Sequence, residues 1–329
     1  MADNQLFNDD GDGVGGGDDV FVYTGGDQEV PRDVKRLRIA ENIDTILAEK
    51  CRECHQLIEV VGHNKMKKIE EYALSDCPSL RRVENMQGVI EIEQYAFWNC
   101  KALSDIDFDK LEIIGHRAFG HCKSLRSINI PSIRRVGAHG FDSCDALTDA
   151  VFGQGLGRIE QFAFWGTALR RIVIPLKDNL ILDEYAFNHC RNLSRVDTLA
   201  GGIHKTITSL HMESWRDEMQ EEIDRINQTL PNTRAIIKTT AIQEWITRVL
   251  STMEHYKREH KLLLKEAMTL LELALWKAKL LNETHEKKCN VDEMTKKAKI
   301  DVEAARKEHR VTCGADIVIE NVLPFLALE

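Results

Sequence analysis

One stretch of the chain reads Ile114-Gly115-His116-Arg117-Ala118-Phe119-Gly120-His121-Cys122-Lys123-Ser124-Leu125-Arg126-Ser127-Ile128-Asn129-Ile130-Pro131. The same order of apolar and small residues returns on both sides of it. Its small residue recurs in steps of 22 or 23 residues, at Ala73, Ala96, Ala118, Gly140, Ala163 and Ala186. A weaker first copy contains Ile46, Cys51, Cys54, Leu57 and Val60. The sequence therefore predicts seven coils.

A unit of 22 or 23 residues is too short to enclose a hydrophobic core by itself. Its apolar positions must stack on the same positions of the next unit, so the core becomes a line of like side chains. Within each unit, an alternating segment such as Leu125-x-x-Ile128-x-Ile130 predicts a short strand that pairs with its copies in parallel. The Ile114–Phe119 half predicts a return segment that is not a regular helix.

This pattern resembles the BspA-type leucine-rich repeat, whose unit reads I-G-x-x-A-F-x-x-C-x-x-L-x-x-I-x-I-P. The resemblance covers about residues 40–200. It implies an α+β repeat fold, a solenoid with short parallel strands, and a binding role that is adhesive in its better-known secreted members. The remainder of the chain is similar to an uncharacterised helical tail found on such repeat proteins.

Three regions follow from the distribution of charge and pattern. Residues 1–29 form an acidic, Gly-rich lead that we expect to be flexible, because it offers nothing to bury. The net charge of -9 comes almost wholly from this end, since residues 1–30 carry eight acidic side chains and no basic one. Residues 30–203 form the solenoid. Residues 204–329 form a helical tail, and the segment just after Gly202 is expected to cap the last coil.

The tail contains a long stretch without proline that predicts an amphipathic helix near residues 240–288. A capping-box pattern, Thr240-Ala241-Ile242-Gln243, stands at its start. One apolar stripe of this helix is a candidate interface for a partner or a second copy, while internal packing of the stripe is the alternative. The stripe consists of Leu264, Met268, Leu271 and Leu275.

A binding surface is expected on the sheet face of the solenoid. The residues between the inward-pointing Leu and Ile of each strand point outward and vary from coil to coil, as in a ladder of exchangeable side chains on a rigid scaffold. A merely solvated face is the alternative. The candidate binding residues are Arg82, Glu84, Asp105, Asp107, Ser127, Asn129, Asp149, Arg171, Arg195 and Asp197.

Neither a metal nor a cofactor is expected. Six cysteines share one repeat position and so predict a buried ladder of small apolar side chains rather than ligands. Their positions are Cys54, Cys77, Cys100, Cys122, Cys144 and Cys190. Phosphate-binding glycine motifs are absent from the repeat and the tail, and we find no catalytic triad or carboxylate pair to assign.

These observations favour a non-enzymatic protein-interaction or scaffold module that binds an unknown protein ligand and can form a homodimer through its tail. The alternatives are a cell-surface adhesin of the same repeat type and an enzyme with a site near His255, Glu259 and His260. The sequence contains no basic patch of the kind that would indicate a nucleic-acid partner. No signal sequence or membrane span is recognisable, so an intracellular, cytoplasmic location is expected.

Overall fold

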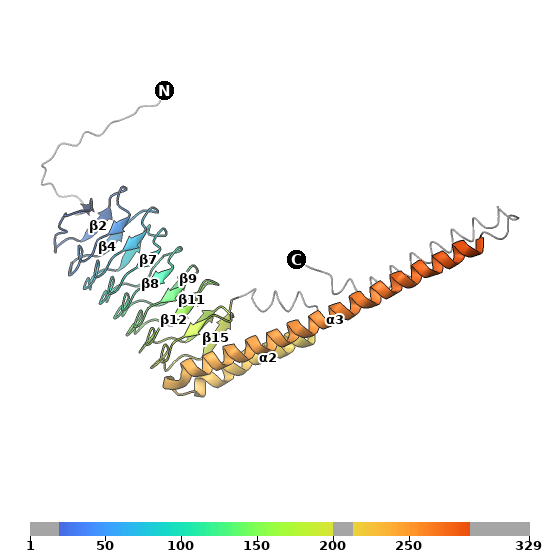
Figure 1. Cartoon of the computed structure of the whole chain (residues 1–329). Helices are drawn as coiled ribbons and strands as arrows, with labels where there is room; N and C mark the ends of the chain where they lie inside the picture. The colour runs from blue at the N-terminus through green and yellow to red at the C-terminus, as the bar shows by residue number, and fades with distance from the viewer. Residues whose placement is uncertain (1–19, 200–212, 290–329) are drawn as a thin grey trace, which may run out of the picture. The chain divides into compact units, whose positions relative to one another are not determined.

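The computed structural model describes residues 20–199 and 213–289 (Figure 1). The described chain forms two compact units. The first unit holds residues 20–172, 181–193 and 234–239, and the second holds residues 173–180, 194–199, 213–233 and 240–289.

The strands form three parallel sheets along the repeat (Figure 1): two four-stranded sheets follow each other, and a seven-stranded sheet takes one short strand from each of the seven coils. The first has the order β1-β2-β4-β6, from Val20–Tyr23, Arg36–Ile39, Glu59–Val61 and Arg82–Glu84. The second has the order β14-β12-β10-β8-β7-β5-β3, from Ile181–Leu182, Arg158–Ile159, Arg135–Val136, Ile113–Ile114, Glu91–Ile92, Lys68–Ile69 and Thr45–Ile46. The third has the order β15-β13-β11-β9, from Arg195–Thr198, Arg171–Ile174, Asp149–Phe152 and Ser127–Ile130.

The predicted strands form where the sequence alternates. In β9, Ile128 and Ile130 are buried while Ser127 and Asn129 are exposed, as expected for side chains on opposite faces of a strand. The seven-stranded sheet confirms the seven coils, but no strand was predicted in this half of the repeat. Each of its strands is only two residues long and consists of the apolar residue that corresponds to Ile114 and the residue before it. A strand of two residues is too short to show alternation in the sequence.

Each return segment turns by means of two residues in the left-handed region, four positions apart. In one coil these are Tyr95 and Asn99, with φ of 56° and 62°. Their N–H groups donate to the carbonyls of His116 and Gly120 in the next coil, at 2.9 and 2.8 Å. The contacts between coils offset the strain of this backbone. The prediction that the segment is no regular helix is confirmed.

One backbone hydrogen bond repeats from coil to coil at the aromatic position. The N–H of Phe97 donates to the carbonyl of Ala118 at 2.8 Å, and that of Phe119 donates to Gly140 at 2.8 Å. The same bond joins Cys51 to Ala73, Leu74 to Ala96, Phe141 to Ala163 and Phe164 to Ala186. Each coil therefore depends on the next one to satisfy its buried N–H group.

The core consists of stacked like side chains. The ring of Phe119 is fully buried and stacks between Phe97 and Phe141, with centroids 5.1 and 5.2 Å apart. Beside this row runs the cysteine ladder, in which the thiols of Cys122 and Cys144 donate to the carbonyls of Phe97 and Phe119. The seven cysteines of residues 20–199 are buried and free, so the predicted ladder is confirmed.

The repeat begins earlier than residue 30. Strand β1 pairs with β2 in parallel, from Val20 opposite Arg36 to Tyr23 opposite Ile39, and the Tyr23 side chain is fully buried. Residues 20–23 therefore belong to the solenoid rather than to a flexible lead, because alternating Val, Phe and Tyr side chains supply both a strand pattern and a core residue.

Two residues at the start of α3 (Lys238–Cys289) complete the last coil of the first unit. The N–H of Phe187 donates to the Thr239 hydroxyl at 3.0 Å, in the place where earlier coils use a carbonyl of the next coil. The ammonium of Lys238, 1% exposed, donates to the carbonyls of Arg191 and Leu193. The segment just after Gly202, which was predicted to cap this end, lies outside the described residues.

The second unit contains α2 (Glu213–Thr229) and most of α3, which are joined by the 3₁₀ turns η1 (Leu230–Asn232) and η2 (Ala235–Ile237). The two helices run side by side (Figure 1), and the indole of Trp245 donates to the carbonyl of Glu222 at 3.0 Å. Asn227 on α2 accepts the N–H of Val196 on β15 at 2.8 Å. Helix α3 begins at Lys238, two residues before the predicted capping box.

Replacing Phe119 by Ala removes the central ring of the aromatic row. We expect this change to lower the free energy of unfolding by about 3–5 kcal/mol, the usual cost of emptying a buried aromatic site. Denaturant titration of the full chain measures the change. Trp165→Ala, at a 37% exposed ring, serves as the control and should cost clearly less. A loss below about 1 kcal/mol at Phe119 would show that this position is not core.

Replacing Thr239 by Val keeps the shape of the side chain and removes the acceptor for Phe187. The buried N–H of Phe187 then lacks a partner, which should destabilise the chain by about 1–3 kcal/mol. Thermal or denaturant unfolding measures the effect. Thr240→Val, at the exposed neighbouring position, is the matched control. Equal stability of the two variants would contradict the capping role.

Candidate functional site

Eight of the ten predicted binding residues lie on strands. Arg82 and Glu84 lie on β6 and are exposed, as are Ser127 and Asn129 on β9. Asp149 on β11 and Arg171 on β13 are half-buried, while β15 carries exposed Arg195 and half-buried Asp197. The Arg195 guanidinium donates to Asp197 at 2.9 Å, so this pair is engaged within its own strand.

Asp105 and Asp107 lie outside any strand, which corrects the prediction that they belong to a continuous sheet face. The first sheet ends at β6 and the third begins at β9, so the coil between them interrupts the face. Asp105 accepts the N–H of Ile106 at 2.9 Å through its own side chain, and so competes with strand pairing. Both aspartates are exposed, and Ile106 between them is buried.

The interruption creates a cleft of about 380 Å³ in the first unit. It brings together four of the predicted binding residues, namely Arg82, Glu84, Asp105 and Asp107. At its edge Asn85 adopts a φ of 59°, the one left-handed non-glycine residue of the described chain outside the two recurrent positions. The lining residues are Arg82, Val83, Glu84, Asn85, Gln87, Ser104, Asp105, Ile106 and Asp107.

The charges in this cleft do not balance. The Arg82 guanidinium donates to Glu59 at 2.6 Å and pairs with Glu84 at 3.2 Å, and the hydrogen bond that Arg82 donates to Glu59 raises the pKa of Arg82. Asp107 accepts the amide of Gln87 at 2.9 Å. Its lining thus holds three carboxylates and one guanidinium that is already shared between two glutamates. The cleft favours a cationic group.

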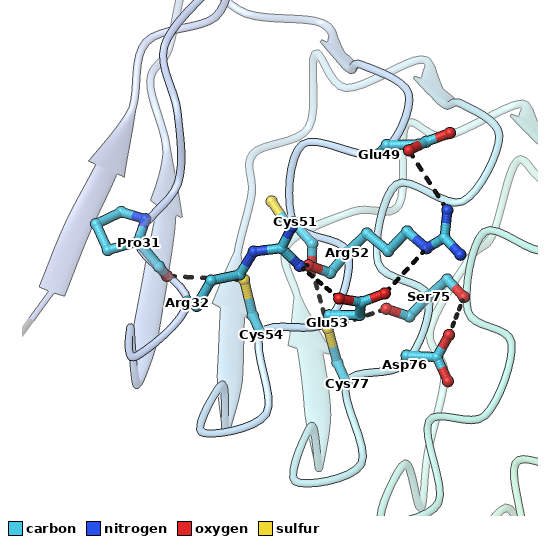
Figure 2. A network of polar contacts seen from close by, with 10 residues as sticks. All are labelled: Pro31, Arg32, Glu49, Cys51, Arg52, Glu53, Cys54, Ser75, Asp76 and Cys77. Carbon is cyan, nitrogen blue, oxygen red and sulfur yellow. Dashed lines mark hydrogen bonds and ion pairs between the residues drawn. The ribbon is translucent and has the colours of Figure 1, made fainter.

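A second polar network joins the first coils of the solenoid (Figure 2). Arg32 donates to the carbonyl of Arg52 and pairs with Glu53 at 3.2 Å. Arg52 pairs with Glu49 at 3.4 Å, and its guanidinium lies 4.9 Å from the centre of the Tyr72 ring. These contacts link neighbouring coils.

The thiols near this network differ in acidity. A hydrogen bond from Cys77, with the nearby Arg32 charge, lowers the pKa of Cys54. The same hydrogen bond and burial raise the pKa of Cys77, and burial raises the pKa of Cys100 to about 12. Since thiolates and not thiols bind metals and react, the ladder is chemically inert from Cys77 onward.

The four residues of the predicted tail stripe differ in their solvent exposure. Leu264 and Leu271 are half-buried, whereas Met268 and Leu275 are 53% and 63% exposed. The half-buried pair lies on the same side as Ala267, which is 9% exposed. The four side chains therefore do not present one uniform surface.

The three tail residues considered for catalysis do not converge. The Nε2 of His255 lies 3.3 Å from a carboxylate oxygen of Glu259 and both residues are exposed, while His260 is buried. Within residues 20–199 and 213–289, no group of three His, Cys, Asp or Glu side chains is placed to hold a metal ion. Neither described α-helix combines the length and the apolar character that a membrane span requires.

Sequence reasoning missed the residues that close the last coil, Asn227, Lys238 and Thr239. Each is an ordinary polar residue in a helical pattern, and nothing in the repeat marks it. A signal was available for Lys238 and Thr239, because they directly precede the capping-box pattern that begins at Thr240. Their partners could only be found in three dimensions.

These features define a class of protein, a solenoid of leucine-rich repeats. The sequence model of the BspA type leucine rich repeat region matches residues 32–145 and 112–212, with six copies. Since the matches span more than half of the chain, it belongs to the BspA-type leucine-rich-repeat family. A search of the curated proteins finds no match.

Crystal structures of bacterial leucine-rich-repeat proteins are similar. A leucine rich cell surface protein from Faecalibacterium prausnitzii A2-165 is 26% identical, with a TM-score of 0.43, over 56% of this chain and 48% of that protein. The T. pallidum leucine rich repeat protein is 21% identical, with a TM-score of 0.41, over 54% and 74%. The pneumococcal vaccine antigen PcpA is 14% identical, with a TM-score of 0.34, over 58% and 39%. The chain spans about half the length of the F. prausnitzii protein.

A thiol reagent applied to the native protein should label Cys77, Cys100, Cys122 and Cys144 only on unfolding. Their side chains are buried, and the raised pKa of each leaves almost no thiolate to react. Mass spectrometry of timed labelling, with the urea-unfolded chain as the reference for full reaction, measures this. Rapid labelling of these four in the native state would contradict the buried ladder.

Proposed function

We propose that the chain is a non-enzymatic interaction module that binds a protein partner through the exposed faces of its solenoid sheets, centred on the cleft between residues 82 and 107. The observation that carries this proposal is the cleft itself. It gathers Arg82, Glu84, Asp105 and Asp107 on a scaffold whose backbone is fixed by bonds between coils. A rigid scaffold with variable surface side chains is how repeat proteins recognise partners.

The charge of the cleft defines the chemistry of the partner. Glu84, Asp105 and Asp107 face a single guanidinium, which Glu59 also engages. A lysine or arginine side chain of a protein partner, entering between the two aspartates, would meet complementary charge. We therefore expect the partner to present a basic segment and the association to weaken as ionic strength rises.

The absence of catalysis is part of the proposal. The repeat family is used for binding, and the cleft is open and lined by carboxylates without a paired nucleophile. His255 and Glu259 are exposed whereas His260 is buried, which supports the proposal that these three residues are not a catalytic site.

We further propose that the tail associates with a second copy of the chain. Helix α3 exposes seven large apolar side chains over a short span, far more than the isolated apolar residues that a monomer surface normally shows. They are Leu262, Leu263, Met268, Leu270, Leu273, Leu275 and Trp276.

An intracellular scaffold and a cell-surface adhesin would both bind through the same sheet face. These two functions therefore differ in the compartment in which the protein is found. Biotinylation of intact cells with a membrane-impermeant reagent distinguishes the two. Labelling of the chain on intact cells would favour the adhesin.

The cleft can be tested by reversing its charge. Changing Asp105 and Asp107 to Lys together should reduce capture of the partner from a cell extract by at least about tenfold, because a basic segment is then repelled. Asp145→Lys with Glu184→Lys, at two exposed acidic positions outside the cleft, is the matched control. Quantitative mass spectrometry of the captured proteins measures the difference. Equal capture by both variants would overturn the assignment of the cleft.

A further inference from the structure

One side of α3 carries exposed apolar residues in a heptad arrangement. Leu263, Leu270 and Leu273 are 38%, 64% and 56% exposed. With Glu266 and Lys277 they occupy successive positions three and four residues apart, which places all five along one seam of the helix. The seam runs for about 21 Å at the rise of an α-helix.

The seam carries two charges, and their placement is symmetric. Leu270 and Leu273 lie at equal distances from the point between Leu271 and Glu272. Glu266 and Lys277 lie at equal distances from the same point, one on each side, and both are exposed. A twofold axis through this point would exchange each residue for its counterpart.

We infer that two copies of the chain pair through this seam in antiparallel orientation. Leu270 of each copy then faces Leu273 of the other, and Glu266 of each copy faces Lys277 of the other. The inference rests on the proposed self-association of the tail and adds its register and direction. It commits to a second copy because the complementary charges lie on the same chain.

The opposite orientation is disfavoured by the same residues. A parallel pair in register would place Glu266 against Glu266 and Lys277 against Lys277, and like charges in contact oppose association. In the antiparallel pair both charge contacts are attractive, and each occurs twice because the interface is isologous.

The remaining exposed apolar residues of α3 are less suited to pairing. Met268 and Leu275 are followed one turn later by Glu272 and Lys279, so charged side chains lie beside them on their own face. The side of Leu264, Ala267 and Leu271 is already partly covered. The Leu263–Lys277 seam instead combines three exposed leucines with two charges of opposite sign that a second copy of the chain can match.

The test is an exchange of the two seam charges in the full chain, followed by sedimentation velocity over a concentration series. Wild type should dimerise. Glu266→Lys and Lys277→Glu should each raise the dissociation constant by at least about tenfold, because each creates two repulsive contacts per dimer. The double variant should return to within about threefold of wild type. Glu272→Lys, the same change off the seam, should leave the constant unchanged.

Two results would count against the inference in different ways. A wild type that dimerises with no response to either single exchange would overturn the antiparallel seam and leave self-association standing. A wild type that stays monomeric throughout the series would remove both. Weakening by the single exchanges without restoration in the double variant would exclude the Glu266–Lys277 contact.

Discussion

The hydrogen bond from one coil to the next is the constraint on which the structure depends. At the aromatic position, a buried N–H in each coil has no acceptor within its own coil and takes the carbonyl of the small residue in the coil that follows. The small residue leaves room for this approach, and the aromatic ring fills the space beside it. Because every coil takes its acceptor from the next, the final coil needs an acceptor from outside the repeat. Thr239 and Lys238 complete this coil with a hydroxyl acceptor and an ammonium donor.

The proposed binding site lies where the regular pattern is interrupted. The two four-stranded sheets place eight strands on this face, whereas the coil of Asp105 and Asp107 contributes none to it, and the cleft there concentrates negative charge on an otherwise mixed surface. The surrounding coils hold this irregular segment in place, because its buried residues, Leu103, Ile106 and Phe108, still occupy the core. In the proposed function, a partner would therefore meet a rigid site whose chemistry is set by side chains that the core does not require.

The repeat, its seven coils, the buried cysteines and the long helix could all be predicted from the sequence, because each is expressed in a periodic pattern of many residues. The break at Asp105 could not, since Ile106 maintains the apolar phase and the competing bond is a local one, in which the Asp105 carboxylate accepts the N–H of Ile106. The partial burial of Leu264 and Leu271 could likewise not be predicted from the sequence. A helical wheel shows which residues share a side, but it does not show which side is covered.

Native-state hydrogen exchange of the Phe187 amide tests the central claim most directly. Phe187 is the last aromatic position, and its N–H has a side-chain acceptor where Phe119 has a carbonyl. If the start of α3 serves as the acceptor for the final coil, the Phe187 amide should be protected to a degree comparable with that of Phe119. In Thr239→Val its exchange should become faster by about tenfold or more, while the Phe119 amide changes far less. A Phe187 amide that exchanges in the wild type as fast as an exposed loop would contradict the account.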